Sequence, residues 1–446
     1  MMKIKDSQYI LLILLHIAIG VLVYLMPFLA AIYGLAIFLF GLYYVIKRRN
    51  KNNEVLLVSA YIVGSDVFLR MTGGSLLYEF SKYGVIIFLT IGMIYSGFSK
   101  KSIPYWIFLI LLIPGIFVAT ETLNLQSDLR VSIMFNISGP FCLGIASIYC
   151  YNREIKFSQV NDILLFLGLS VISTTAYLIL YTPDLKEVLT GTGSNGETSG
   201  GFGPNQVATI MGLGMFIFFS RLIFISKNKL IFFINLIIAC NITYRGLATF
   251  SRGGMITGFV IILILLLFLY KNSNRSGMYK LNLLFIFMAI VFSFIWIYTS
   301  NQTSGLIDKR YANQDAMGRE KESKLTGREE IMESEIDAFY ESPILGIGVA
   351  KGLELRYEKT GQFITSHNEI TRTIAEHGAL GILALIILFL TPIFLYLDNK
   401  EHIYMFCFLF FWLLTINHAA MRIAAPAFIY SLSLLKVTFD KELKSP

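Results

Sequence analysis

The chain has 446 residues, of which 55% are hydrophobic and only 15% are charged. About a quarter of the residues in a soluble domain are charged, so this composition excludes an ordinary soluble protein. The net charge of +8 does not indicate nucleic acid, because basic loops between membrane spans account for it.

Apolar runs long enough to cross a bilayer recur along the whole chain. A spanning helix needs about 20 apolar residues, so we predict an all-α polytopic membrane protein with about 12–14 transmembrane helices. The third and the last two predicted spans are short enough to be half-spans. In chain order, the predicted spans are 8–26, 28–46, 55–69, 83–98, 103–120, 131–150, 160–182, 204–222, 230–246, 253–270, 281–299, 378–397, 403–419 and 422–436.

These spans divide the chain into three predicted regions. Residues 1–299 form an N-terminal bundle of about 11 spans. Residues 300–377 are too polar to span and form a loop domain with amphipathic helices. Residues 378–446 hold about three more spans and a short tail.

Lys and Arg are concentrated in alternate loops, including KRRNK at 47–51 and KNSNRSGMYK at 271–280. By the positive-inside rule these loops are cytoplasmic. Both termini are then cytoplasmic, and the 300–377 loop domain lies outside. The first apolar segment lacks a small-residue cleavage site and is predicted to be a signal anchor.

The first polar cluster on the predicted outer side lies at the span that begins near 253. Ser251 is predicted to cap this span in FSRGG. This places Arg252 at an outer helix end, with Arg245 near the same surface. An arginine at membrane depth often marks a functional site, although a plain interfacial anchor is an equal alternative for either residue.

A second cluster lies in the loop domain. Thr326 to Glu329 fits a capping box that would open a short helix with Arg328 in its first turn. Met332, Ile336 and Phe339 recur at helical spacing and predict an amphipathic helix, which Pro343 and the following glycines end.

The third cluster is SHNEITRTIAEHG at 366–378, directly before an apolar run. Ser366 and Glu369 fit another capping box, so a helix is predicted to begin at His367 and to continue into the span or break at Gly378. The positive potential of a helix start disfavours imidazolium, so His367 is expected to be neutral and able to accept a proton.

His367, Arg328 and Arg252 are thus predicted at three helix starts on one side of the membrane. Helix starts and guanidinium groups both bind phosphate, which indicates a lipid-linked diphosphate. The four cysteines lie in apolar runs without ligand spacing, and no metal motif occurs, so we expect no metal and no cofactor.

Four segments resemble motifs of the O-antigen ligase and polymerase superfamily. They occur in the expected order and cover roughly 200–385. The segments are FGPNQVATIMGLG (Pro-Asn), ATFSRGGMITGFV (Ser-Arg-Gly), TGREEIMESEIDAFYESPILGIGVAKG (Gly-Arg…Pro-hydrophobic-Gly-x-Gly) and SHNEITRTIAEHGALGI (His-Asn…Glu-x-Gly).

The resemblance implies a metal-independent, inverting glycosyltransferase of the bacterial cytoplasmic membrane, with a site on the outer side. Its donor would be an undecaprenyl-diphosphate-linked oligosaccharide, and its acceptor a glycan or lipid A core. The span count slightly favours a polymerase over a ligase. The resemblance leaves open a chain-length regulator or a flippase as protein partners, besides membrane lipids.

The resemblance also implies roles for single residues. His367 would be the base or would orient the acceptor, and Arg252 and Arg328 would hold the diphosphate. The remaining candidates are Arg245 for diphosphate binding and, in a second tier, Asn205, Asn368, Arg372 and Glu376.

Two other functions stay open from the residues alone. A transporter would place its polar groups near mid-membrane between inverted repeats, and a flippase for lipid-linked glycans would need a cationic cavity that opens to both leaflets. The collection of titratable groups at one boundary favours an enzyme.

Overall fold

The structure is a computed structural model that describes residues 5–124, 128–321, 323 and 328–439. Regular structure in these residues is helical apart from two short strands, β1 (Glu154–Lys156) and β2 (Lys436–Thr438), which pair in parallel. The prediction of an all-α polytopic membrane protein is therefore confirmed.

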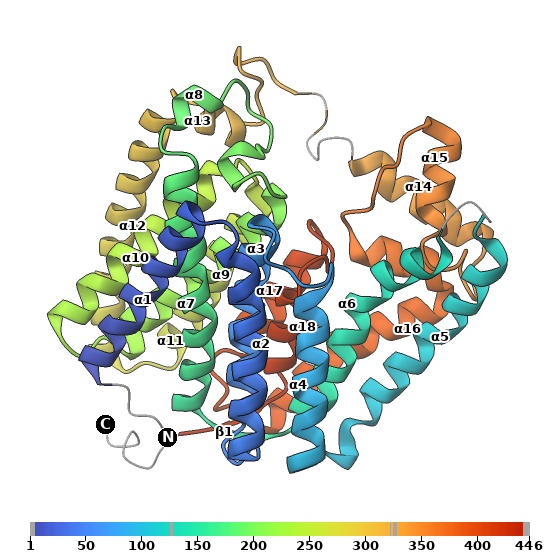
Figure 1. The fold of residues 1–446 in the computed structure, drawn as a ribbon, viewed down its shortest axis with the longest axis horizontal. Helices are drawn as coiled ribbons and strands as arrows, with labels where there is room; N and C mark the ends of the chain where they lie inside the picture. The colour runs from blue at the N-terminus through green and yellow to red at the C-terminus, as the bar shows by residue number, and fades with distance from the viewer. Residues whose placement is uncertain (1–4, 125–127, 322, 324–327, 440–446) are drawn as a thin grey trace. The chain divides into compact units, whose positions relative to one another are not determined.

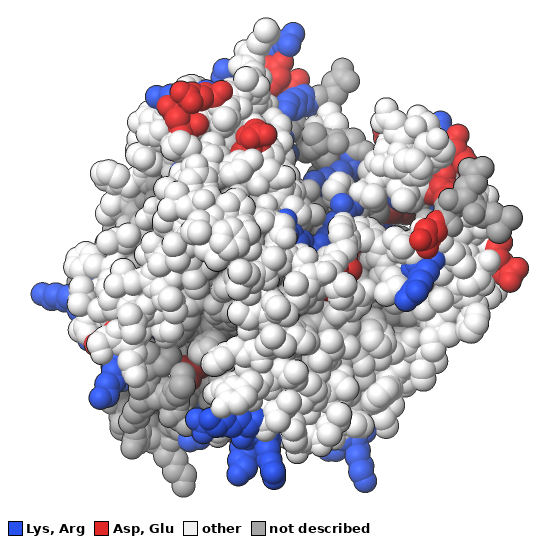
Figure 2. All heavy atoms as spheres, in the orientation of Figure 1, with Lys and Arg blue, Asp and Glu red and all other residues white. Residues whose placement is uncertain are grey.

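Ten helices among the described residues are long and apolar enough to cross a membrane. They are α1 (Asp6–Leu25), α2 (Leu29–Arg48), α5 (Ile103–Thr122) with the 3-10 turn Lys100–Ser102 before it, α6 (Leu129–Cys150), α7 (Phe157–Tyr181), α9 (Pro204–Phe224), α10 (Lys229–Ala248), α11 (Arg252–Lys271), α12 (Arg275–Gln302) and α16 (Glu369–Asp398). Large areas of the face in Figure 2 carry no charged side chain, as a surface in contact with lipid requires.

The other four predicted spans fall on helices that are shorter or more polar. These are α3 (Glu54–Met71), α4 (Phe80–Ser96), α17 (Met405–Ile416) and α18 (Ala425–Leu432). With 12 and 8 residues, α17 and α18 are too short to cross a bilayer alone. Both are therefore half-spans by length.

The chain folds into two compact units. Unit 1 comprises Met1–Lys47, Leu56–Tyr78 and Ser158–Glu322, and unit 2 comprises Arg48–Val55, Glu79–Phe157 and Ser323–Pro446. Their shorter helices are α8 (Leu185–Val188), the 3-10 turn Glu197–Ser199 and α13 (Leu306–Tyr311) in unit 1, and α14 (Arg328–Glu341) and α15 (Lys351–Thr360) in unit 2. The division at 299 and 377 is a prediction about membrane topology, and it stays a prediction.

Unit 1 is built around a close crossing of α9 and α11. A Cβ on Gly254 would lie 2.3 Å from the carbonyl carbon of Ala208, and one on Gly258 would lie 2.5 Å from the carbonyl oxygen of Gly212. Only glycine allows two backbones to approach so closely. The crossing fixes the N-terminal ends of α9 and α11 beside each other.

Unit 2 is built around a break in α16. Gly378 has φ 60° and ψ −140°, so the helix is interrupted there, as the sequence allowed. The segment 343–350, between α14 and α15, docks on this break: the amides of Ile347 and Gly348 donate to the carbonyls of Ala375 and Glu376, at 2.9 and 3.2 Å. Figure 1 shows α14 and α15 at this end of α16, beside α5 and α6.

We predict that Gly378→Ala destabilises unit 2. A Cβ at this position would need a positive φ and would lie 2.6 Å from the carbonyl carbon of Ile344. Gly361→Ala is the matched control, because Gly361 has φ 70° but no atom within 4 Å of the added Cβ.

The positive φ costs about 1–2 kcal/mol in either variant, and only Gly378→Ala adds a close contact with the backbone of Ile344. Gly378→Ala should therefore lower the thermal unfolding midpoint in detergent more than Gly361→Ala does. Equal midpoints for the two variants would contradict the docking of 343–350 on the break.

Candidate functional site

In unit 1, the Pro-Asn and Ser-Arg-Gly motifs meet at the crossing of α9 and α11. The helix α11 begins at Arg252 with Ser251 as its N-cap residue, as predicted. The Ser251 side chain makes no cap hydrogen bond, however, because its hydroxyl donates to Oδ1 of Asn205 at 2.8 Å. The two motifs therefore support each other through a side-chain bond between helix starts.

Arg252 belongs to a cluster of cations in unit 1 that the sequence did not predict. Its Nη1 donates to the carbonyl of Arg310 at 3.4 Å, and Arg310 Nε donates to the carbonyl of Phe250 at 2.9 Å. Burial, followed by the positive charges of Arg310 and Arg252, holds the pKa of Lys321 below its ordinary value. Arg252, Arg310 and Lys321 thus lie close together and are named here the unit 1 cation cluster, in which Arg310 is buried.

Arg245 is held deeper, at the C-terminal end of α7. Its guanidinium donates to the carbonyls of Thr182 and Ile179, at 2.9 and 3.4 Å, and the residue is only 3% exposed. These carbonyls end a helix and carry partial negative charge, which a buried guanidinium stabilises. The predicted role of Arg245 in diphosphate binding stays a prediction.

In unit 2, the start of α16 differs from the prediction. The prediction that Ser366 caps a helix beginning at His367 is wrong, because α16 begins at Glu369 and its N-cap is Asn368, whose Oδ1 accepts from the amides of Ile370 and Thr371. Asx side chains satisfy such amides at least as well as serine. His367 therefore lies in the extended segment before the helix.

The loop after α17 holds this segment in place. The amide of Ala420 donates to the carbonyl of His367 at 3.1 Å, and Nδ2 of Asn368 donates to Oδ1 of Asn417 at 2.8 Å. Arg422 of the same loop donates to the Thr365 hydroxyl and the Ser366 carbonyl, at 2.6 and 2.7 Å. An arginine that the sequence analysis missed thus lies next to the candidate histidine.

His367 lies in a positively charged environment. Burial lowers its pKa most, and the charges of Arg422, Arg328 and His418 lower it further, to about 4. The neutral imidazole was predicted, but these charges and burial explain it rather than a helix start. The Nδ1 atom of His367 is buried and makes no hydrogen bond within the described residues.

Arg328 is the first residue of α14, and its Nη1 donates to the carbonyl of His418 at 3.2 Å. Thr326, the predicted cap, lies outside the described residues. The predicted apolar face is wrong for Ile336, which is 42% exposed, while Glu335 and Ala338 are buried. Glu335 turns inward because its two oxygens accept from Arg356 and from the Thr371 hydroxyl.

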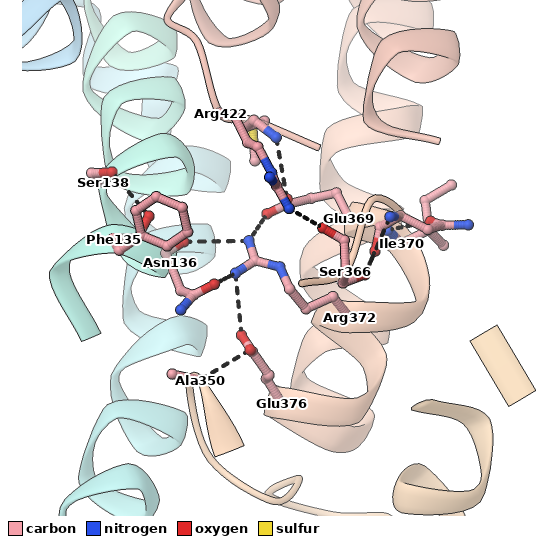
Figure 3. Close-up of polar contacts among 12 residues, drawn as sticks. Phe135, Asn136, Ser138, Ala350, Ser366, Glu369, Ile370, Arg372, Glu376 and Arg422 are labelled. Carbon is pink, nitrogen blue, oxygen red and sulfur yellow. Dashed lines mark hydrogen bonds and ion pairs between the residues drawn. The ribbon is translucent and has the colours of Figure 1, made fainter. Parts of the chain in front are cut away.

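Arg372 connects α16 to α6 at the centre of unit 2 (Figure 3). Its guanidinium donates to the side chain and, at 3.3 Å, to the carbonyl of Asn136, and it pairs with Glu369. Glu376 lies 3.7 Å away, and its other oxygen accepts from the amide of Ala350 at 2.9 Å. Arg372 and Glu376 therefore hold the break of α16 and the segment 343–350 together.

A cavity of about 50 Å³ lies beside this network. A water needs roughly 10–15 Å³ of such space, so the cavity has room for a few waters but not for a sugar. Its lining includes Ser366, Arg372 and Arg422. No group of three or more His, Cys, Asp or Glu in the described ranges is placed to hold a metal ion.

The structure thus brings most of the predicted residues into two clusters. Asn205 and Arg252 meet in unit 1, and His367, Asn368 and Arg328 lie around the loop after α17 in unit 2. The prediction that Arg252, Arg328 and His367 lie on one side of the membrane and bind one diphosphate stays a prediction, because Arg252 belongs to the other unit.

The residues that were missed are Arg310, Lys321, Glu335, Asn417 and Arg422. Only Arg422 carried a usable signal, since it is an arginine in a short loop between two apolar runs on the predicted outer side.

Part of the chain is similar to a known protein family. Residues 234–386 match the family model described as O-antigen ligase. No curated protein matches the chain. The match covers α11, α14 and the start of α16, and so includes Arg252, Arg328 and His367 but not Asn205 or the loop after α17. The matched residues make up about a third of the chain, and the match supports a function in glycan processing at a membrane.

Proposed function

We propose that the protein transfers an oligosaccharide from a lipid-diphosphate carrier to an acceptor hydroxyl, at the outer face of the cytoplasmic membrane. The observation that carries the proposal is His367, a neutral imidazole that cations surround. A neutral base next to positive charge suits a reaction in which a hydroxyl loses a proton while a diphosphate gains negative charge.

In the proposed reaction, the acceptor oxygen attacks the anomeric carbon and the bond from that carbon to the diphosphate oxygen breaks. The electron pair leaves with the diphosphate, and the hydroxyl proton moves to Nε2 of His367. Attack from the face opposite the leaving group inverts the anomeric centre. Arg328 and Arg422 bind phosphate oxygens and stabilise the departing charge.

A pKa near 4 makes a free imidazole a weak base, and donor binding would correct this. The charges of Arg422 and Arg328 are two causes of the low pKa. A bound diphosphate neutralises these charges, so the pKa of His367 rises toward the value that favours proton transfer at neutral pH. The base would thus be activated only when the donor is present.

Arg372, Glu376 and Asn368 have positioning roles in this proposal. Glu376 accepts from the amide of Ala350, Asn368 donates to Asn417, and Arg372 pairs with Glu369. Together these bonds hold the segment that contains His367. Asn205 has the same role for Arg252 through Ser251. No metal and no cofactor is required, because the donor arrives with an activated bond.

We predict that His367→Ala lowers glycan transfer about 10²–10⁴-fold, the usual contribution of a general base. Arg328→Ala should also abolish extension of the glycan in cells. Arg319→Ala is the matched control for the arginine, since Arg319 is exposed and pairs with Asp315. Protein level in the membrane should stay unchanged in all three variants, and full transfer by His367→Ala would refute the role of the base.

The pH dependence gives a second test. Because burial and Arg422 hold the pKa of His367 to about 4, kcat/KM of the free enzyme should show no imidazole-dependent loss between about pH 6 and 7. Arg422→Gln removes a positive charge, so the acidic limb should move to higher pH. Arg422→Lys keeps the charge and should leave the limb in place. A limb near the ordinary histidine value in the unaltered protein would contradict the assignment.

The two activities of the superfamily are distinguished by the surface glycans of a deletion strain. We favour a polymerase, so loss of the protein should leave core structures capped with single repeat units. Polymer that accumulates on its carrier lipid would instead identify a ligase. Gel electrophoresis of the surface glycans separates the two outcomes.

A further inference from the structure

Two aromatic rings are stacked on the surface of unit 2, where α15 meets the segment that leads to His367. The ring centroids of Tyr357 and Phe363 are 4.2 Å apart, and the ring planes are inclined by 12°. Tyr357 is 44% exposed and Phe363 is 70% exposed. Because Tyr357 covers one face of the Phe363 ring, an exposure of this size requires the opposite face to be open. The two rings, named here the aromatic platform, thus present a flat apolar surface.

The surroundings of the aromatic platform are polar. Half of the ten residues of α15 are charged, and the exposed residues 358–362, between the two rings in the chain, are all polar or glycine. A surface in contact with lipid has apolar neighbours instead. The aromatic residues that anchor proteins at membrane interfaces are Trp and Tyr, whereas the more exposed ring here belongs to Phe363. The platform therefore suits a ligand with an apolar face and a polar rim.

The backbone on both sides of the platform is fixed. Arg356, which is 7% exposed, donates from Nε to the carbonyl of Ile364 at 2.7 Å. The residues next to Tyr357 and Phe363 are thus bonded to each other, and a left-handed turn at Gly361, with φ 70°, reverses the chain between them. A surface that is held in place before binding loses little entropy when a ligand binds to it.

The aromatic platform lies within a short distance of His367. The histidine follows Phe363 by four residues, so their Cα atoms are at most about 14 Å apart. Arg422 bonds to the Thr365 hydroxyl and the Ser366 carbonyl within this stretch, which fixes the path of the chain. A glycan of a few sugars can therefore contact the platform while one of its hydroxyls reaches the imidazole.

A pyranose ring has a surface that matches such a platform. Its C–H groups form an apolar face that packs on the negatively polarised face of an aromatic ring, while its hydroxyl groups point outward toward polar neighbours. Exposed Lys359 and Gln362 flank the two rings and can bond to these hydroxyl groups. The platform thus offers both kinds of contact that a sugar ring makes.

We propose that the aromatic platform is a saccharide subsite, which binds one sugar ring of the acceptor glycan on the open face of Phe363. The inference rests on the proposed function, in which the acceptor hydroxyl reacts at His367. It adds a specificity to that function. The bound ring must have an unsubstituted C–H face, and the acceptor must extend beyond the sugar that reacts.

Binding to the full-length protein in phospholipid nanodiscs tests this subsite. The probe is the soluble oligosaccharide that mild acid releases from the surface glycan of cells that make the protein. Phe363→Ala should weaken binding of this probe about two- to tenfold, the size of one aromatic contact. Phe363→Trp keeps an aromatic face and should retain binding.

Tyr340→Ala is the matched control, because Tyr340 on α14 is 73% exposed but its ring is inclined by 57° to that of Phe339. This variant should bind the oligosaccharide as the unaltered protein does. Equal binding by Phe363→Ala and the unaltered protein, or no binding by either, would overturn the inference.

Steady-state kinetics should show where the platform contacts the acceptor. Phe363→Ala should raise KM for the acceptor and leave kcat unchanged, because the platform contacts a sugar that is distant from the reacting bond. An acceptor shortened to a single sugar should be used equally well by the variant and the unaltered protein. A fall in kcat with an unchanged KM would contradict a saccharide subsite.

Fluorescence separates a saccharide subsite from a contact with lipid. The emission that Phe363→Trp adds to that of the three native tryptophans should respond to the oligosaccharide and should not be quenched by brominated phospholipid. Quenching by the lipid without a response to the oligosaccharide would show that Phe363 is a membrane contact, and the inference would then be wrong.

Failure of this inference is distinguishable from failure of the proposed function, because binding of the oligosaccharide requires no proton transfer. If His367→Ala keeps full transfer while Phe363→Ala weakens binding, only the proposed base fails. If Phe363→Ala binds normally while His367→Ala is inactive, only the saccharide subsite fails.

Discussion

The arrangement of unit 2 depends on α16, whose backbone hydrogen bonds are interrupted at Gly378. At Gly378 the backbone of α16 leaves the helical path, and the carbonyls of Ala375 and Glu376 then accept amides from 343–350. Unsatisfied carbonyls inside a membrane protein are costly, so the break and the docked segment require each other. This mutual requirement explains why two motifs far apart in the sequence occur together.

Charged side chains of unit 2 reinforce this backbone contact. Arg372 and Glu369 join the first turn of α16 to α6, and Glu376 accepts from the amide of Ala350. The extended segment with His367 leaves from the same turn. A substitution at the break should therefore alter the position of His367 through the bonds of Glu376, Arg372 and Glu369, without touching the histidine directly.

Much of the fold could be predicted from the sequence, because hydropathy and loop charge depend on local composition. Every predicted span falls on a helix. The bond between Ser251 and Asn205, by contrast, joins two segments whose contact the sequence did not predict. The start of α16 was misplaced by two residues, because Ser366 and Asn368 are both good caps and tertiary contacts of Asn368 decided between them. The inward turn of Glu335 was not predictable, since its partner Arg356 lies on another helix.

The glycine crossing of α9 and α11 also determines which helices of unit 1 can move. The backbones of α9 and α11 are in direct contact at Gly254 and Gly258, so the two helices have no room to slide past each other and should move as one rigid pair. By contrast, only 6% of the apolar window of α12 is buried. Motion within unit 1 should therefore displace α12 more readily than α9 or α11.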